Sequence, residues 1–589
     1  MIELPKIVIV GGGVAGLTAA HELKERGFRV TIYEREPECG GKARSFVVPD
    51  GYKCNEIVGL PAEHGFRFFP GFYRHLIDTL ARIPARNAVG SYVIDNLIKV
   101  HKGAIAQVDK AFSVFPTRGP QTTLDGVRFF RDLFSNPSFG LGADEAAFAA
   151  SRLGLAMTTC EERRDAEMDD VTWWQYMCAD SMSDNYKKVV VNGLTRNFVA
   201  MRAEETSLRT AITILARLLE DFLSGRGVDR ILNGPTSQVW IAPWVEYVQS
   251  AVGGQFPVTV CTGKRVHHFV FDERISRISG VQFAEGEIVS DPKAIYIAAV
   301  PIESMTQILQ NGPPMLLERS PALKLLCDRH LQVNWMSGIL YYLKSDSPMT
   351  RGHVVYLDSG WALTSISQNQ FWVNKIESYG DGRVQGVLSA IISDWFKAGN
   401  GGVSTNTAYQ AEDGDEVANE ALAEIRAHTV AQSNVDISQE NIVGYYLDPA
   451  IEFNDIRQRI SGLMPAVEFG MRAAKLRQEG IKTEKLRVEH DFEPLFINTV
   501  GSWLYRPGEA TGIENLFLAS DYVKTNTDLA TMEGANESGR RAVNRILNLL
   551  NTSGRRCRIF QFREPTIFAP MRALDRYFFK LGLPHPALL

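Results

Sequence analysis

A glycine-rich loop stands between a short apolar run and a helical pattern near the start of the chain. Residues 7–16, IVIVGGGVAG, join a stretch of β-formers to this loop. In such a loop Gly11 allows a tight turn, Gly13 lets the backbone approach a pyrophosphate, and Gly16 lets the next helix pack closely. Apolar residues at helical spacing then predict a helix over 17–26. Its N-terminus would present free N–H groups and a positive dipole end to a diphosphate.

A second strand and an acidic residue complete this pattern. Gly27 stops the helix, residues 29–33 form another apolar run, and Glu34 comes directly after them. An acid at this place can accept a hydrogen bond from a ribose 2′-hydroxyl. A loop of this kind also occurs in plain βαβ units, but strand, helix, second strand and acid stand here in the order that a dinucleotide site needs.

Composition and charge exclude several classes of protein. The chain of 589 residues is long enough for two connected domains, and its net charge of −5 gives no basic field for nucleic acid. The seven cysteines are scattered without a CxxC pair, which argues against a disulfide frame or a metal site and favours a reducing compartment. We find no signal peptide and no uncharged apolar run long enough to cross a bilayer. We therefore expect a cytoplasmic protein, attached at most to a membrane face.

The order of elements indicates an α/β fold with long insertions. Residues 80–225 look mainly helical, and alternating strands follow over 258–283. Residues 294–301 form a buried strand closed by proline, and a last strand-like run at 516–521 precedes a helix that begins near Met532.

Three further motifs follow the first loop. A second glycine turn, Gly40-Gly41-Lys42, is followed by Arg44, and a strand begins at Val266. Near the end of the chain, residues 519–522 (ASDY) precede residues 530–535 (ATMEGA). In this order the motifs resemble those of the flavin-dependent amine oxidase and phytoene desaturase superfamily, and the resemblance covers most of the chain.

The resemblance is closer in some places than in others. Plant-type phytoene desaturases share the GGK of residues 40–42, whereas Ser520 stands where the family's flavin signature has glycine. Residues 63–71 (EHGFRFFPG) and 361–368 (WALTSISQ) resemble a bacterial branch placed beside carotenoid desaturases and hydroxysqualene dehydroxylases. Membership of that branch does not give the substrate.

The resemblance implies FAD as the cofactor and a discontinuous Rossmann-like FAD-binding domain. Its three segments are expected to be 1–80, 225–301 and 502–554. A mixed α+β substrate-binding domain would comprise 81–224 and 302–501. Residues 555–589 would form a basic amphipathic C-terminal tail.

The resemblance also implies roles for single residues. Asp521 would accept a hydrogen bond from a ribityl hydroxyl, the helix at Met532 would turn its N-terminal amides toward the flavin, and the strand at Val266 would bind adenine through its backbone. Lys42 and Arg44 would offset the diphosphate charge. Alternatively, Asp521 is an ordinary capping residue and the two cations are a solvated surface pair. The cofactor-binding set expected on this basis is Gly11, Gly13, Val14, Ala15, Gly16, Glu34, Arg35, Gly41, Lys42, Arg44, Gly65, Phe66, Arg67, Val266, Asp521, Thr531, Met532 and Ala535.

Two residues are catalytic candidates by the same resemblance. Gly65-Phe66-Arg67 would lie at the reactive face of the flavin, where Arg67 could stabilise the reduced ring or orient the substrate. Arg67 could instead extend from an apolar surface without any such role. His64 is either a base or a structural histidine. Glu533 either serves the flavin or complements a helix dipole.

The final segment, 555–589, differs from the rest in character. Arginine and lysine outnumber acids in it, and aromatic and aliphatic residues are interleaved with the charges. Such a segment can lie on an anionic membrane, which would make a peripheral membrane contact. It can also dock beside the substrate entrance of its own protein, or on a neighbouring subunit.

The glycine-rich motifs and the family resemblance together predict an FAD-dependent oxidoreductase that dehydrogenates a hydrophobic, isoprenoid or carotenoid-like substrate. Hydride would pass from a C–H bond to flavin N5, and oxygen or a quinone would be the electron acceptor. Three alternatives remain: an amine oxidase, a non-redox isomerase or dehydroxylase of a polyene, and a non-catalytic relative that binds prenylated proteins. Aromatic residues such as Tyr341, Trp361 and Trp372 could line an apolar tunnel or belong to the core.

Overall fold

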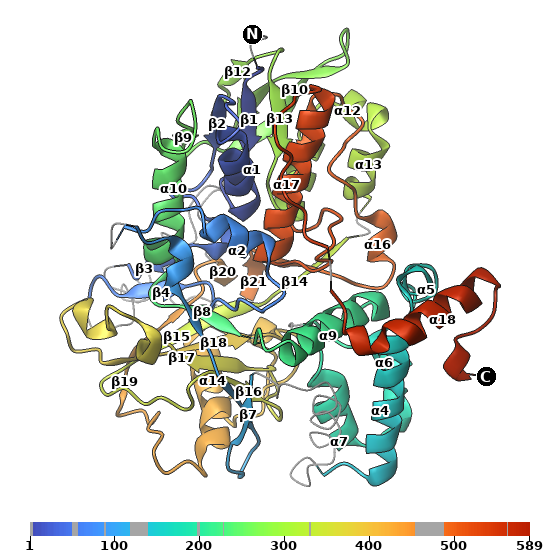
Figure 1. Cartoon of the computed structure of the whole chain (residues 1–589). Helices are drawn as coiled ribbons and strands as arrows, with labels where there is room; N and C mark the ends of the chain where they lie inside the picture. Colours follow the sequence, from blue (N-terminus) through green and yellow to red (C-terminus); the bar gives the residue numbers. More distant parts are fainter. Residues whose placement is uncertain are drawn as a thin grey trace.

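The computed structural model describes residues 4–49, 57–86, 90–117, 140–196, 201–227, 229–328, 331–453, 488–561 and 563–588. Two main sheets organise this part of the chain (Figure 1). A parallel sheet with its helices occupies the upper part of Figure 1, and a larger mixed sheet lies below it, beside a group of helices. No helix among the described residues is both long enough and apolar enough to cross a membrane.

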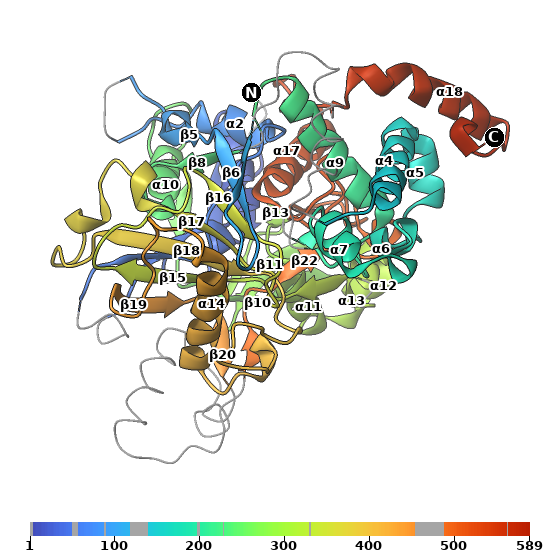
Figure 2. The ribbon, with the colours of Figure 1, turned by 90° about the horizontal axis from the view of Figure 1, so that it is seen from below.

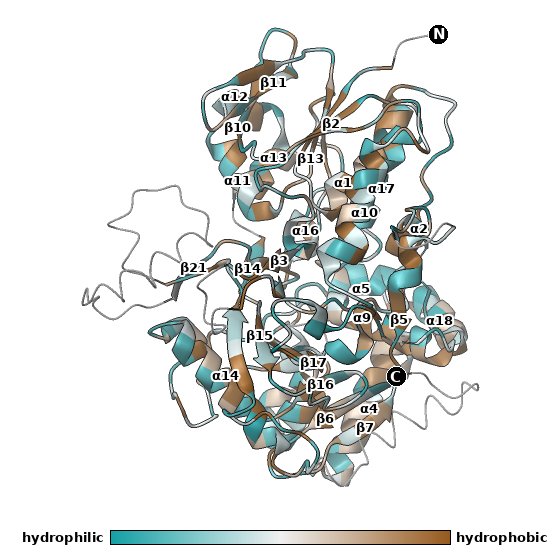
Figure 3. Cartoon of the chain, turned by 90° about the vertical axis from the view of Figure 1, so that its left-hand side faces the viewer, coloured by the Kyte–Doolittle hydropathy of each residue, from teal (hydrophilic) through white to brown (hydrophobic). Residues whose placement is uncertain are grey.

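The upper sheet is parallel and has five strands in the order β23-β13-β1-β2-β9. Its strands are β1 (Ile7–Val10), β2 (Val30–Tyr33), β9 (Thr259–Cys261), β13 (Ile295–Ala298) and β23 (Leu516–Leu518). Every residue of β1, β2 and β13 is buried, as expected for a parallel sheet that is covered on both faces. Figure 3 shows brown, apolar segments along the strands of this sheet. The predicted α/β class is confirmed.

Helix α1 (Val14–Lys24) follows the glycine loop directly and packs against α17 (Met532–Leu549). It begins and ends earlier than the predicted 17–26, because the backbone becomes helical straight after the loop and turns left-handed at Gly27, with φ 80°. At the crossing, a Cβ on Gly539 would come within 2.7 Å of the carbonyl oxygen of Ala15. The two helices are therefore closer at Gly539 than any residue with a side chain would allow.

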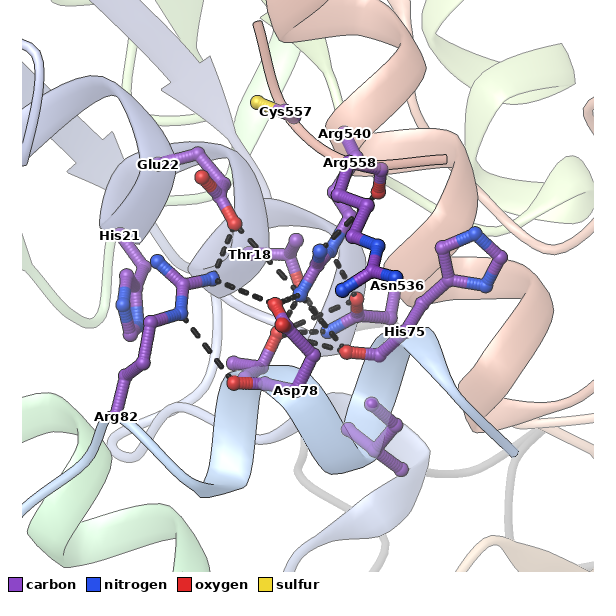
Figure 4. A network of polar contacts seen from close by, with 12 residues as sticks. Thr18, His21, Glu22, His75, Asp78, Arg82, Asn536, Arg540, Cys557 and Arg558 are labelled. Carbon is purple, nitrogen blue, oxygen red and sulfur yellow. Dashed lines mark hydrogen bonds and ion pairs between the residues drawn. The ribbon is translucent and has the colours of Figure 1, made fainter. Parts of the chain in front are cut away.

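A buried polar network joins α1 and α17 to α2 (His75–Leu80) (Figure 4). Arg540, which is 1% exposed, donates to Oδ2 of Asp78 at 2.7 Å and to Oδ1 of Asn536 at 2.9 Å. Asn536 in turn donates to Oγ1 of Thr18 on α1 at 2.8 Å. Burial alone would raise the pKa of Glu22, but the arginines beside it lower that pKa to about 2.

The second sheet has seven strands in the order β19-β15-β18-β17-β16-β6-β7. They are β6 (Lys102–Ala106), β7 (Ser113–Pro116), β15 (Ser337–Leu343), β16 (His353–Tyr356), β17 (Thr364–Ser367), β18 (Gly386–Ile392) and β19 (Ile442–Leu447). Neighbouring strands are antiparallel except β16 and β6. Helix α14 (Gly414–Thr429) packs on this sheet through Val417, Ala421 and Ile425, and Figure 2 shows it lying across the strands.

The described part of residues 80–225 is mainly helical, as predicted, but it also contains the strands β6 and β7. The helices of this stretch are α4 (Ala143–Thr158), α5 (Glu161–Glu167), α6 (Trp173–Tyr176), α7 (Asp184–Tyr186) and α9 (Leu208–Leu223). Strand β6, with the sequence KGAIA, holds few β-formers and is stabilised by pairing with β16, where Ala104 lies opposite Val354. The local sequence pattern contains no sign of that distant partner.

Short strand pairs and further helices complete the described chain. The strands are β3 (Ser45–Val47), β4 (Pro61–Glu63), β5 (Leu97–Lys99), β8 (Arg230–Leu232), β10 (Val266–Asp272), β11 (Arg277–Phe283), β12 (Ile288–Ser290), β14 (Gln332–Asn334), β20 (Ile451–Phe453), β21 (Val488–Asp491) and β22 (Leu495–Ile497). The helices are α10 (Ala242–Gln249), α11 (Ile302–Gln310), α12 (Pro314–Arg319), α13 (Pro321–Cys327), α16 (Ser502–Tyr505) and α18 (Ala569–Lys580). The strands predicted over 258–283 are present, whereas the predicted domain bounds stay a prediction.

We expect Arg540→Leu to lower the free energy of unfolding by roughly 3–5 kcal/mol, because it leaves buried acceptors without their cation. Arg545→Leu is the matched control, since Arg545 lies on the exposed face of the same helix, and its effect should stay within about 0.5 kcal/mol. Urea unfolding of both variants measures the difference. Equal stabilities would contradict the importance of the network.

Candidate active site

The first glycine loop forms a narrow backbone cradle at the carboxyl end of β1. Gly11 has a left-handed φ of 102°, and a Cβ there would lie 2.4 Å from the carbonyl oxygen of Ala299. A Cβ on Gly16 would lie 2.0 Å from the carbonyl oxygen of Gly11. Gly13 has more room, because its nearest neighbour in the Cβ direction is Cα of Gly41 at 3.8 Å. The loop leaves backbone amides and the N-terminus of α1, with Val14 and Ala15 in its first turn, open to an anion.

Glu34 and the second glycine turn lie against this loop. Oε2 of Glu34 accepts from the N–H of Gly12 at 2.6 Å, and Oε1 accepts from the N–H of Glu36 at 2.9 Å. The N–H of Gly40 donates to the carbonyl oxygen of Gly12 at 2.9 Å. Burial raises the pKa of Glu34. The structure therefore brings together both glycine turns and the acid that the sequence placed at a dinucleotide site.

The cations of the second turn are paired with carboxylates that no sequence motif had indicated. Nζ of Lys42 lies 3.1 Å from Glu303, in the first turn of α11, and also contacts the carbonyl oxygen of Pro494. Nη1 of Arg44 donates to Oε1 of Glu493 at 3.0 Å. Both cations are largely buried, so the prediction of a solvated surface pair is not supported. Burial alone would lower the pKa of Lys42, but Glu303 and other nearby carboxylates raise it.

His64 lies between two carboxylates from different parts of the chain. Its Nδ1 is 2.7 Å from Oδ1 of Asp448, and its Nε2 is 2.6 Å from Oε2 of Glu493. Burial alone would lower the pKa of His64, but Asp448 and Glu493 raise it to about 9. Burial together with Asp448 raises the pKa of Asp491 to about 8. An imidazolium with both nitrogens engaged is suited to holding segments together and is poorly suited to accepting a proton.

Arg67 binds the backbone of the second glycine turn. Its guanidinium donates to the carbonyl oxygen of Lys42 at 2.9 Å and to that of Gly65 at 3.0 Å. Glu63 lies 3.7 Å away. The residue thus shapes the turn that carries Lys42 and Arg44, which is a positioning role, while its predicted catalytic role stays a prediction. Arg35 pairs with Glu36 at 2.9 Å and is partly exposed.

The carboxyl-terminal motifs meet the glycine loops from the other side of β1. Asp521 follows β23 and lies close enough to Lys42 to raise the pKa of that lysine. Thr531 caps α17 by accepting from the N–H of Gly534 at 3.2 Å, which leaves Met532 and Ala535 in the first turn. Val266 begins β10, and the segment just before it pairs with the backbone at Glu34 through the N–H of Lys264 at 2.8 Å.

Glu533 makes contacts that differ from both of its predicted roles, which were to serve the flavin or to complement a helix dipole. Its Oε1 accepts from the N–H groups of Arg74 and His75, each at 2.8 Å, and its Oε2 accepts from the N–H of Leu76 at 2.9 Å. The side chain therefore caps α2, a different helix from the one that carries it. Nδ1 of His75 is also 2.8 Å from Oε1.

A large apolar cavity adjoins these motifs. Its volume is about 710 Å³, and it lies among α4, α9 and the strands β16, β6 and β7 at one side of the large sheet. Its lining includes Phe66 and also Ala530 and Thr531, the two residues before α17. Other lining side chains are mostly aliphatic or aromatic, among them Leu153, Met157, Leu215, Leu219 and Phe496. Tyr341, Trp361 and Trp372 are instead buried in hydrophobic core clusters.

One polar pair lies in the wall of the cavity and was missed at the level of sequence. Nδ1 of His353 on β16 is 2.5 Å from Oδ2 of Asp229, and the His353 ring lies 4.6 Å from that of Phe66. Burial raises the pKa of Asp229, although His353 acts against this. Asp229 is the one carboxylate that the described residues place in the cavity lining. No motif joins these two residues, so only their contact in the fold could reveal them.

The ion pairs of His64 predict a pH-dependent stability. Its pKa in the folded protein lies above the ordinary value of 6.5, so its stabilising contribution is present below pH 6.5 and is lost as the pH rises through about 9. We expect His64→Gln to cost about 3 kcal/mol below pH 6.5 and much less above pH 9. Urea unfolding of the wild type and His64→Gln across this pH range measures the difference in their free energies of unfolding. His267→Gln, at an exposed position of β10, is the control, and a pH-independent gap for His64→Gln would contradict the assignment.

Comparison with known proteins agrees with this geometry. The family model described as an NAD(P)-binding Rossmann-like domain matches residues 9–83, and that described as flavin-containing amine oxidoreductase matches residues 454–547. The 15-cis-phytoene desaturase of Synechococcus elongatus is 22% identical over 551 residues, which cover 92% of this chain and 96% of that protein. The carotenoid phi-ring synthase of Streptomyces griseus is 58% identical over 81 residues, which cover 14% of this chain and 15% of that protein.

Solved structures show the same fold at lower identity. A putrescine oxidase bound to putrescine superimposes with a TM-score of 0.55 at 15% identity, covering 92% of this chain and 99% of that chain. The cyclohexylamine oxidase of Brevibacterium oxydans gives a TM-score of 0.53 at 13% identity, covering 93% and 100%. The glycine cradle, helix α17 and these similarities agree: the chain is similar to the flavin-dependent amine oxidase and phytoene desaturase superfamily and is a flavin-dependent oxidoreductase.

Proposed function

We propose that the protein uses FAD to dehydrogenate an apolar polyene of the carotenoid class. The observation that carries this proposal is the 710 Å³ cavity, whose apolar lining reaches Thr531 at the N-terminus of α17. A cavity of this size is within the range of ligand pockets for small molecules. The phytoene desaturase and phi-ring synthase similarities support the same substrate class.

The residues at the glycine cradle fit FAD rather than a smaller flavin. The loop at Gly13 and the N-terminus of α1 would hold the diphosphate, and Glu34 the adenosine ribose. Lys42 and Arg44 would add positive charge near the diphosphate, and Asp521 would accept from the ribityl chain. A diphosphate needs open space beside the backbone of Gly13. A Cβ built on Gly13 would have its nearest neighbour 3.8 Å away, so that space is present.

The chain's own residues provide positioning and a dry environment. A flavin bound here would supply the two-electron oxidation of a C–H bond. Apolar side chains such as Leu215 and Phe496 exclude water from the cavity, and Phe66 connects its lining to the turn at Gly65. Arg67 and His64 hold the turn and the carboxylates around it in place.

The cavity is less suited to an amine. The charge of an ammonium group in an apolar cavity is compensated best by an unpaired carboxylate. Asp229, the one carboxylate that the described residues place in the lining, is already paired with His353. This pairing favours the polyene over the amine, although the same fold occurs in amine oxidases.

We expect Gly13→Val to fold normally and to weaken FAD binding on the order of 100-fold, because the added side chain fills the diphosphate groove. The backbone of Gly13 is extended, with φ −73°, and tolerates a β-branched residue. Flavin fluorescence titration of the apoprotein measures the affinity. Gly508→Val is the control, since Gly508 has no neighbour within 4 Å in the Cβ direction. Unchanged affinity in Gly13→Val would refute the placement.

Anaerobic addition of phytoene to the flavin-loaded protein should bleach the oxidised-flavin absorbance, whereas putrescine should not. Leu215→Trp reduces the cavity and should slow the bleaching at least about 10-fold while FAD stays bound. Leu504→Trp, at a residue that is 66% exposed, is the control and should react normally. Bleaching by putrescine alone would favour an amine oxidase. Conversion of the polyene without bleaching would show a non-redox reaction.

A further inference from the structure

Two short segments connect the second glycine turn to the wall of the apolar cavity. In the first, Arg67 binds the turn, and its neighbours Phe66 and Phe68 line the cavity. In the second, Glu493 contacts the turn and is followed by β22, all of whose residues line the cavity. Figure 3 shows β21, the strand that precedes Glu493, between the two main sheets. Each segment thus passes, over a few residues, from the proposed cofactor turn to the proposed substrate site.

The second segment is held to the turn at two consecutive residues. Oε1 of Glu493 accepts from Nη1 of Arg44 at 3.0 Å, and the carbonyl oxygen of Pro494 accepts from Nζ of Lys42. The Glu493 side chain is 8% exposed, and Arg35 lies 3.6 Å from the same Oε1. Breaking such a shielded ion pair leaves a charge alone in a poorly hydrated place, so the start of β22 is fixed relative to the turn.

The two segments are also joined to each other. Nε2 of His64 lies 2.6 Å from Oε2 of Glu493, and Nδ1 of His64 lies 2.7 Å from Oδ1 of Asp448. One carboxylate oxygen of Glu493 therefore contacts a cation of the turn, and the other contacts the segment that contains Phe66. The positions of both parts of the cavity wall depend on this one side chain.

An apolar chain in this cavity is positioned by the shape of the wall. A hydrocarbon has no hydrogen-bond donors or acceptors, so the polar groups that orient most ligands have nothing to bind. One methylene more or less in an apolar pocket changes discrimination only about 10–200-fold. A displacement of the wall by ~1 Å relative to the cofactor would therefore change which carbon–carbon bond is best placed for reaction.

We propose that Glu493 is a positioning residue, which fixes the cavity wall relative to the cofactor turn and thereby determines which bond of an apolar chain is dehydrogenated. It acts through Arg44 on the turn and through His64 on the other segment. The choice of bond rests on the proposed function. The attachment of β22 to the turn does not, and it is measured without substrate.

The choice of bond is tested with phytoene and the FAD-loaded protein. The wild type should form one predominant first product, which liquid chromatography separates from isomers with other absorption spectra. In Glu493→Gln the ratio of this product to its isomers should fall on the order of 10-fold. FAD should still bind to this variant, because the glycine loop, Lys42 and Arg44 are unchanged. Glu493→Asp keeps the charge and should give a ratio closer to that of the wild type.

Glu303→Gln is the matched control. It removes a carboxylate that lies 3.1 Å from Lys42, but the described residues of α11, the helix that carries Glu303, do not line the cavity. Its product ratio should equal that of the wild type, whatever its rate. His64→Gln should shift the ratio as Glu493→Gln does, and the double variant should shift it no further, because both changes remove the same ion pair.

Hydrogen exchange with and without FAD tests the attachment itself, at a temperature where melts show every variant folded. In the wild type, FAD should slow amide exchange in residues 40–44 and also in residues 491–498, whereas in Glu493→Gln it should slow exchange only in residues 40–44. Retained protection of residues 491–498 in this variant, or none in the wild type, would overturn the attachment.

A wild-type product ratio in Glu493→Gln would overturn the role in choosing the bond. If the wild type forms no product from phytoene, the proposed function fails with it. The exchange measurement then still decides whether Glu493 attaches the cavity wall to the turn.

Discussion

The nucleotide-binding part depends on close contacts between backbone segments, which are possible only because glycines place no side chain between them. A Cβ on Gly16 would meet the carbonyl oxygen of Gly11 at 2.0 Å, and one on Gly539 would meet that of Ala15 at 2.7 Å. These contacts press α1 between the parallel sheet and α17. They fix α1 relative to α17, so the two parts of the proposed cofactor site come together.

Buried ion pairs then hold the other segments to this framework. His64 and Arg44 both contact Glu493, which follows β21, and His64 also contacts Asp448 beyond β19. The large sheet is thereby attached to the second glycine turn by charges that are excluded from water. Breaking such pairs is costly because a buried charge is left alone, which makes the arrangement specific. Lys42 and Glu303 extend the same principle to α11.

Local sequence patterns were sufficient for some elements and insufficient for others. The glycine loop, β1, β2 and α17 follow from short-range rules of burial, turn geometry and helix capping, so they could be predicted. Strand β6 could not, since its residues have little β-propensity and its pairing with β16 comes from a distant segment. The same holds for Glu533, whose position suggested a local dipole effect but whose carboxylate caps α2.

The sequence by itself determined the cofactor class, because a dinucleotide loop needs glycines at fixed spacing within a few residues. The tertiary structure alone decided what surrounds that loop. The partners of His64 and Arg67 and the cavity beside Thr531 are all formed by segments far apart in the chain. Contacts of this kind depend on how helices and sheets pack, and residue spacing carries no record of them.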